Sequence, residues 1–200
     1  MNIKISPGNS KMGKIPSISL PSVLTCRADA PCYKKCYARK IERLRKSVRD
    51  AYQHNYDVLT TDKDTYWREV EASIMMSRFF RFHVSGDIPD MSYLIRMINV
   101  AIKNSHCNIL CFTKKYELVN CAVENGIYIP DNMHIVFSAW ENLEMNNKFN
   151  FPEAHVRYKD GSTTASIDAK TCGGNCAECA VTDGGCWNLK HGEQVVFDEH

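Results

Sequence analysis

The stretch "RFFRFHVSGDIPDMSYLIRMINVAIKNSHCNILCF", residues 78–112, contains one complete unit of the expected fold. Residues 78–84 are rich in aromatic side chains, as is typical of a strand. Residues 90–104 place apolar side chains at helical spacing behind Asp90, a residue type that caps helices. Residues 108–112 read as a second, buried strand. A strand, a helix and a second strand indicate a βαβ unit, whose two strands are parallel.

The same alternation continues on both sides of this unit. We expect further strands at 15–20, 133–140 and 154–158. We also expect a helix over 64–77 capped by Asp64, and a helix over 114–125 capped by Thr113. These elements predict an α/β fold with a parallel sheet. Active residues of such folds lie at the carboxyl ends of the strands, so the loop after residue 20 and the segments that follow the later strands are candidate sites.

A long helix is expected over 37–57. Its apolar positions step by three and four residues and form one helical face. They are Tyr37, Ile41, Leu44, Val48 and Tyr52.

The composition constrains the setting of the protein. A length of 200 residues suits one domain with a small appendage, and we expect residues 1–160 to form the core and 161–200 a cysteine-rich module. The net charge of +2 gives the whole molecule no general affinity for polyanions. No long apolar segment suggests a signal peptide or a membrane span, so we expect a cytoplasmic protein without a membrane partner. Disulfides are rare there, and clustered cysteines more often bind metals or take part in catalysis.

The first cysteine cluster lies in "CRADAPCYKKCYARK", residues 26–40. Cys26, Cys32 and Cys36 follow the spacing C-x5-C-x3-C. Three thiolates on one loop can hold three irons of a cubane cluster and leave the fourth iron open for a substrate or cofactor. Three-ligand catalytic zinc sites stay open in the same way. Unrelated buried thiols are the alternative interpretation.

The second cluster has the spacing C-x3-C-x2-C-x6-C within a glycine-rich tail. It consists of Cys172, Cys176, Cys179 and Cys186. Four ligands make a closed site, which suits either an auxiliary [4Fe–4S] cluster or structural zinc, since tetrahedral sulfur ligation serves both. We favour iron–sulfur because of the first cluster. Ligation is expected to give the tail its order.

The remaining cysteines are Cys107, Cys111 and Cys121. They lie in or beside one predicted strand and its following helix, so core packing explains them better than ligation. His83, just before "SGD", is likewise expected to be a core residue. Lys114 and Lys115 stand at a strand end, from which one of them could reach a site.

The order strand, three-cysteine loop, helix, strand and "VSGDIP" resembles the radical S-adenosylmethionine (SAM) superfamily. "CYARK" is similar to a group of small phage and mobile-element members that carry "CYA" after the third cysteine. "CFTKKYE" and "IVFSAWEN" are similar to later strand ends of that group, and the resemblance covers roughly residues 15–140. It departs from the superfamily in the cysteine spacing, which is usually C-x3-C-x2-C, and in "SGD", which replaces "GGE".

The resemblance implies a partial (β/α) barrel and an enzyme of the radical SAM type, with an unknown substrate. Cys26, Cys32 and Cys36 would hold the [4Fe–4S] cluster that cleaves SAM. The implied SAM-contacting residues are Tyr37, Ser85, Gly86 and Asp87, with Asp87 meeting the amino group of SAM. A reductant such as flavodoxin or ferredoxin would be the partner. If the tail cysteines, three of which have the standard spacing, hold the SAM-cleaving cluster instead, the two roles swap.

Two other classes of function stay open. One is a zinc-binding module that binds nucleic acid through the basic run 34–49, which carries eight lysines and arginines. The alternative, purely structural interpretation of that run is that it forms the solvent-exposed face of an amphipathic helix. The other class is an iron–sulfur electron carrier or redox sensor without SAM chemistry.

Overall fold

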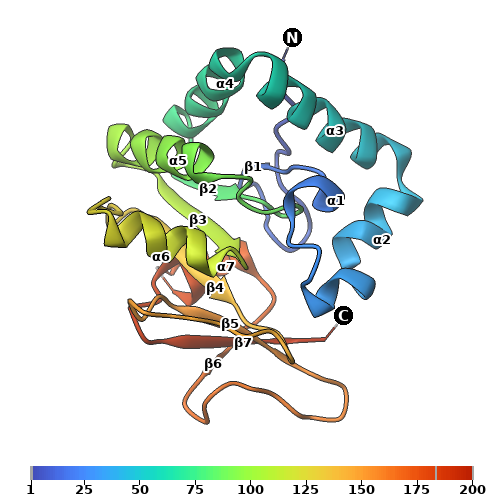
Figure 1. The fold of residues 1–200 in the computed structure, drawn as a ribbon, viewed down its shortest axis with the longest axis vertical. Coiled ribbons are helices and arrows are strands. Elements are labelled where there is room, and N and C mark those ends of the chain that lie inside the picture. Colours follow the sequence, from blue (N-terminus) through green and yellow to red (C-terminus); the bar gives the residue numbers. More distant parts are fainter. Residues whose placement is uncertain (1, 183, 200) are drawn as a thin grey trace.

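A computed structural model describes residues 2–182 and 184–199. It confirms the α/β class and contains a seven-stranded sheet with the order β1-β2-β3-β4-β5-β7-β6 (Figure 1). Every neighbouring pair in the sheet is parallel. The strands are β1 (Ser17–Ile18), β2 (Phe79–Phe82), β3 (Asn108–Thr113), β4 (Met133–Ser138), β5 (Glu153–Arg157), β6 (Lys170–Thr171) and β7 (Gln194–Asp198).

The helices connect these strands and flank the sheet. The α-helices are α1 (Ser22–Thr25), α2 (Tyr37–Leu44), α3 (Lys46–Thr61), α4 (Lys63–Met75), α5 (Met91–Lys103), α6 (Tyr116–Glu124) and α7 (Cys176–Val181). Two 3-10 helices, η1 (Pro31–Lys34) and η2 (Gly185–Trp187), lie beside the cysteines. The βαβ unit predicted from residues 78–112 is confirmed as β2-α5-β3, and the Asp90 side chain accepts a hydrogen bond from the Tyr93 amide at 2.8 Å as its cap.

The single helix expected over 37–57 is wrong. Arg45 is extended (φ −121°, ψ 99°) and separates α2 from α3. The buried Glu42 of α2 accepts a hydrogen bond from the Ser22 amide, at the start of the loop that carries Cys26, Cys32 and Cys36 (the cysteine loop). Asn55 of α3 forms hydrogen bonds with the backbone of Lys4 and with the Ser19 carbonyl, in the first segment of the chain. One straight helix would hold Glu42 and Asn55 about 20 Å apart. Their partners Ser22 and Ser19 are only three residues apart, so the chain turns between α2 and α3. Three side chains of the expected apolar face are exposed instead: Tyr37, Ile41 and Leu44.

Two expected helix caps are also wrong. Asp62, not Asp64, caps α4 by accepting from the Thr65 amide at 3.0 Å. Thr113 is the last residue of β3, and α6 begins three residues later. Its hydroxyl donates to the carboxylate of Asp87 at 2.6 Å.

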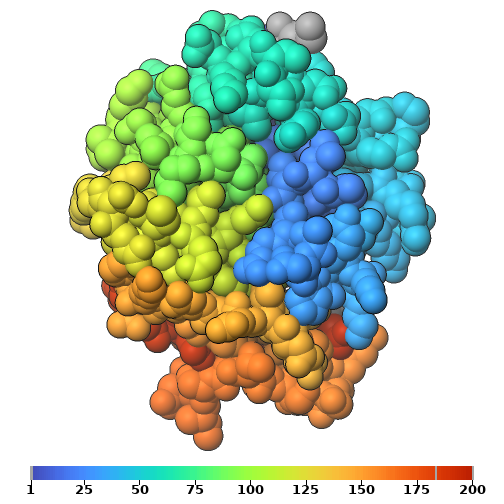
Figure 2. Space-filling model, in the orientation of Figure 1, coloured from blue at the N-terminus to red at the C-terminus, as the bar shows by residue number. Residues whose placement is uncertain are grey.

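The sheet is buried on both faces, as all-parallel sheets usually are. Alternate strand residues, such as Phe80, Phe82 and Ile109, face α4, α5 and α6 in the larger core cluster. The intervening residues face a second cluster that the tail and the first segment of the chain complete, through Trp187 and Met12 among others. Figure 2 shows residues 50–125 over the upper part of the molecule and residues 150–170 over the lower part.

The tail takes part in the main sheet. Strand β7 pairs with β5 in a register that runs from Glu153 opposite Gln194 to Arg157 opposite Asp198. Strand β6 pairs only with the outer side of β7. Backbone pairing therefore orders part of residues 161–200 independently of any cysteine ligation.

None of the helices in residues 2–182 and 184–199 has the length and apolar content needed to cross a bilayer.

The packing of the tail can be tested separately from its thiols. Trp187 is 3% exposed and its ring lies 5.1 Å from that of Phe79, whereas Val181 is 86% exposed. Trp187→Ala should lower the free energy of unfolding by about 3–5 kcal/mol, the usual loss for a buried Trp. Val181→Ala should change it by less than about 0.5 kcal/mol. Urea denaturation measures both, and equal midpoints for the two variants would show that the tail does not pack on the sheet.

Candidate functional site

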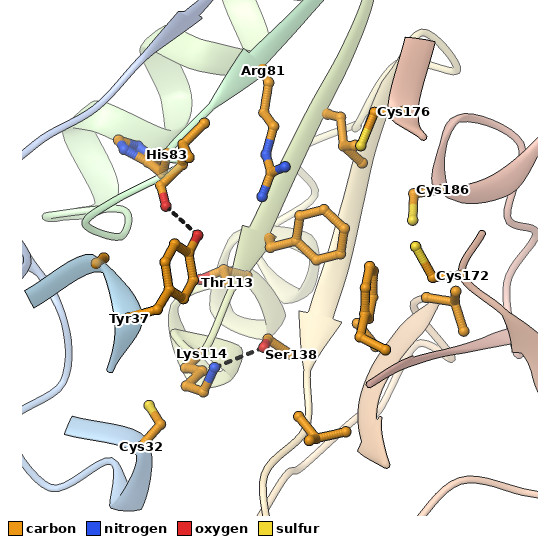
Figure 3. Close-up of a pocket in the computed structure, with 18 of the residues that line it drawn as sticks. Cys32, Tyr37, Arg81, His83, Thr113, Lys114, Ser138, Cys172, Cys176 and Cys186 are labelled. Atoms are coloured by element: carbon orange, nitrogen blue, oxygen red, sulfur yellow. Dashed lines mark hydrogen bonds between the residues drawn. The ribbon is translucent and has the colours of Figure 1, made fainter. Parts of the chain in front are cut away.

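A cavity of about 750 Å³ lies between the tail and the carboxyl ends of β1 to β4. Both cysteine clusters line it. The residues that the resemblance assigned to SAM line it as well: Tyr37, Ser85, Gly86 and Asp87. Figure 3 shows Cys32 and Tyr37 on one side of this cavity and Cys172, Cys176 and Cys186 on the other. Groups separated by up to 160 residues are thus brought to one place, at the edge of the sheet where α/β proteins bind ligands.

The first cysteine cluster sits on the loop that leaves β1. Cys26 ends α1, Cys32 lies in η1 and Cys36 is the residue before α2. Burial raises the pKa of Cys26 to about 12 and also raises that of Cys32. These thiols are therefore protonated at neutral pH, and a metal that binds them displaces protons.

The second cluster surrounds α7 and η2. Cys172 directly follows β6, and its sulfur accepts a hydrogen bond from the Gly174 amide at 3.4 Å. A Cβ at Gly185 would stand 2.6 Å from the Cys179 sulfur, so only glycine fits beside this thiol. Burial raises the pKa of Cys186 to about 12, while the charge of Arg81 opposes the rise.

The donor set fits a soft metal or an iron–sulfur cluster. All seven thiols are free of disulfides and line one cavity, and thiolate is the ligand that such centres prefer. As placed, no three Cys, His, Asp or Glu side chains of the described residues stand close enough together to hold a metal ion. Ligation at either cluster therefore requires the cysteine-bearing segments to draw together.

Asp87 connects the loops around the cavity. Its carboxylate accepts from the Thr113 hydroxyl at 2.6 Å, the Lys114 amide at 2.9 Å and the Ile88 amide at 2.7 Å. Its own amide donates to the Thr25 hydroxyl at 3.1 Å, one residue before Cys26. Burial raises the pKa of Asp87, and these hydrogen bonds oppose the rise. The carboxylate thus joins the end of β2 to the end of β3, and the backbone amide joins the end of β2 to the cysteine loop.

Ser85 and Gly86 make the rest of this junction. The Ser85 hydroxyl donates to Glu42 at 2.6 Å, and Glu42 also accepts from the Ser22 amide. Gly86 has φ +85°, and a Cβ there would stand 2.7 Å from the Leu20 carbonyl oxygen and the Thr25 hydroxyl. Glycine is required here for contact with the cysteine loop, because neither the backbone conformation nor the space admits a side chain.

Tyr37 reaches the same segment from α2. Its hydroxyl donates to the Val84 carbonyl at 2.8 Å (Figure 3). Although the residue as a whole is 46% exposed, its hydroxyl lies against the Val84 carbonyl, and the desolvation of this group raises its pKa. The aromatic ring therefore forms part of the cavity wall beside the first cysteine cluster.

His83 is buried, as expected, but without hydrogen-bond partners for either ring nitrogen. It adopts φ +59°, which turns its ring toward Phe82 and Tyr93 instead of continuing the strand alternation. Burial lowers its pKa to about 3.

The three cysteines outside the two clusters differ in burial. Cys107 and Cys111 are fully buried, which confirms the core interpretation for them. Cys121 is exposed on α6, where the expectation of core packing is wrong. The basic run 34–49 lies on η1, α2 and the start of α3, and its cations are exposed apart from Arg39, which stacks on Tyr33.

Two functional features were missed from the sequence. Arg81 projects into the cavity from β2, as its place between aromatic residues in "FFRF" could have indicated, since alternate strand residues share a face. Glu42 is the single acid among the cations of the run 34–49, and that isolation was the available signal.

A protein-family model described as "Gene product 88" matches residues 2–171, which include the first cysteine cluster and end one residue before Cys172. Two curated relatives are similar, each called "Gene 88 protein", from Mycobacterium phage L5 and Mycobacterium phage D29. Each is 31% identical over 146 residues, 66% of this chain and 60% of the relative. The chain thus spans about 60% of the length of these relatives. No solved structure matches.

The junction at Asp87 predicts a specific loss of stability. Asp87→Asn keeps the shape but turns an amide NH2 toward at least one of the three donors, which should cost about 1–3 kcal/mol of unfolding free energy. Asp90→Asn is the matched control, because asparagine caps helices as well as aspartate does. Urea denaturation near neutral pH compares them. If Asp87→Asn unfolds at the wild-type midpoint, the carboxylate does not hold the loops together.

The buried imidazole of His83 predicts loss of stability in acid. Its pKa is about 3 in the folded chain and near 6.5 when unfolded. Between these two pH values the imidazole is protonated in the unfolded chain but not in the folded chain. The contribution of His83 to the free energy of unfolding is therefore complete above pH 6.5 and falls as the pH drops below it. The slope should be about 1.4 kcal/mol per pH unit.

His83→Asn, which tolerates the left-handed backbone, should flatten this part of the pH profile. His106→Asn, at an exposed position, should leave it unchanged. Chemical denaturation at a series of pH values measures both, and an unaltered slope in His83→Asn would contradict the assignment.

Proposed function

We propose that this chain, which belongs to the gene product 88 family, is a cytoplasmic iron–sulfur enzyme of the radical SAM type. The observation that carries the proposal is that all seven predicted ligand thiols line one cavity, which adjoins the carboxyl ends of parallel strands. A closed structural zinc module needs only four ligands and no adjoining cavity. Free thiols in these numbers also suit a reducing compartment.

Cys26, Cys32 and Cys36 would hold the cluster that has an open iron. When bound, this cluster supplies the electron that breaks a carbon–sulfur bond of SAM. The loop of only three thiols supports this role, because a fourth protein ligand would close the site. The electron would come from a reductant such as flavodoxin or ferredoxin.

The remaining residues at this end of the cavity would position the loop and shield the reaction from water. The Asp87 amide, which donates to the Thr25 hydroxyl, fixes the loop to the end of β2. The three bonds to the Asp87 carboxylate fix that turn to the end of β3. Among the described residues, Asp87 Oδ2 accepts only the Lys114 amide, so it would keep a lone pair for a ligand ammonium group. Tyr37 supplies an aromatic wall. The sheet would form a partial (β/α) barrel whose inner face turns to this cavity.

Cys172, Cys176, Cys179 and Cys186 would hold a second, closed centre. The Gly174 amide bonded to the Cys172 sulfur supports a thiolate there, since N–H donors stabilise negative sulfur. A second [4Fe–4S] cluster is the proposed occupant and zinc the alternative.

Metal analysis of anaerobically prepared and reconstituted protein tests the proposal. Two cubanes correspond to about eight irons and eight sulfides per chain. Cys32→Ala and Cys176→Ala should each reduce iron to about four, and Cys32→Ala should abolish reductive cleavage of SAM. Cys121→Ser is the matched control, because this thiol is exposed on α6 outside the cavity.

The outcomes separate the classes of function. Stoichiometric zinc without sulfide would replace the proposal by a zinc module, for which nucleic-acid binding through residues 34–49 would be the next test. Full iron without SAM cleavage would leave an electron carrier or redox sensor. Loss of SAM cleavage in Cys176→Ala, with cleavage retained in Cys32→Ala, would reverse the roles of the two clusters.

A further inference from the structure

Arg81 occupies the middle of the cavity. It extends from β2 between Tyr37 on one side and Cys176 and Cys186 on the other (Figure 3). Its guanidinium carbon stands 4.9 Å from the centre of the Phe112 ring, so the planar head is held against an aromatic wall. This position lies between the two cysteine clusters, where a ligand of the cavity would bind.

The guanidinium has no anionic partner among the described residues. Its Nε is buried without a hydrogen bond. In the part of the chain that the structure describes, no ion pair joins it to a carboxylate. Arg81 is half-buried, with its Nε shielded from water, and charges in such positions are normally paired. The unpaired guanidinium inside a cavity therefore indicates a missing negative group.

The rest of the lining is also richer in cations than in free acids. The Lys114 ammonium donates to the Ser138 hydroxyl at 2.7 Å and lies over the Trp140 ring. Lys11 lies over the ring of Phe197. The acidic Asp198 is already paired with Arg157 at 2.8 Å. The field inside the cavity therefore favours a negatively charged ligand.

We propose that Arg81 binds the carboxylate of an organic ligand with an apolar or aromatic body, held in the cavity between the two cysteine clusters. A guanidinium offers two parallel N–H groups that match the two oxygens of a carboxylate. The aromatic rings of Phe112, Trp140 and Trp187 supply apolar surface for the body of the ligand. This inference names the ligand class of the cavity to which the proposed function assigns SAM chemistry, and in that sense rests on it.

Indole-3-acetate and its neutral amide, indole-3-acetamide, are the probes. They share shape and aromatic body and differ in the carboxylate. Fluorescence or calorimetric titration of the full chain, with and without reconstituted iron, measures both affinities. Wild-type protein should prefer the acid at least tenfold, and Arg81→Met should bind the two equally. Arg81→Lys should keep part of the preference, because lysine keeps the positive charge but lacks the two parallel N–H donors of the guanidinium.

Arg78→Met is the matched control, because Arg78 is exposed just before the same strand and does not line the cavity. It should retain the full preference for the acid. Wild-type protein that binds the acid no better than the amide, or binds neither, would overturn the proposal. So would an acid preference that survives in Arg81→Met, which would leave Arg81 as a counter-charge for the cysteine clusters.

The same titration with SAM and its decarboxylated form identifies the source of the carboxylate. If Arg81→Met removes a preference for SAM over the decarboxylated form, the carboxylate is that of SAM. If it changes only the indole pair, the carboxylate belongs to a second ligand. The binding assay needs no iron, so an acid preference without iron would uphold this inference even if the radical SAM proposal failed.

Discussion

The buried carboxylate of Asp87 is the constraint on which the cavity depends. It is 5% exposed and is satisfied by donors from its own turn and from the end of β3. The backbone amide of Asp87 donates a hydrogen bond to the hydroxyl of Thr25, at the start of the cysteine loop. A buried acid of this kind tolerates little change, because each lost donor leaves a desolvated oxygen unpaired. The loop with the first three cysteines is therefore fixed relative to two strand ends, although it contains little regular structure itself.

The central part of the fold could be predicted because its signals are local. The pattern of strand, cap and helix in residues 78–112 reflects the backbone preferences of these residues and the burial of one face of each element. Both properties depend on residues that are close together in the sequence. The break at Arg45 could not be predicted in the same way. No glycine or proline marks it, and its cause is the attachment of Glu42 and Asn55, thirteen residues apart, to two nearby positions of a distant segment, Ser22 and Ser19. The pairing of β7 with β5 likewise depends on contacts about forty residues apart.

The candidate site shows the same division. The cysteine spacings indicated ligands, but only the tertiary structure places both clusters around one cavity. Residues 85–87 were predicted to face a cofactor. They line the cavity, yet Ser85 and Gly86 mainly serve the attachment of the cysteine loop. A short polar motif at a strand end can have either role, and the sequence does not record which partner its hydrogen bonds will find.

The sheet order places β7 between β5 and β6, although β7 is the last of the three to be synthesised. Strand β6 has no place in the sheet until β7 has joined it, and Cys172 directly follows β6. During translation the second cysteine cluster thus leaves the ribosome before the strand that anchors it. If this cluster binds a metal as proposed, its final geometry becomes available only after β7 has paired with β5 and β6, so metal uptake would follow the folding of the tail rather than the synthesis of the cysteines.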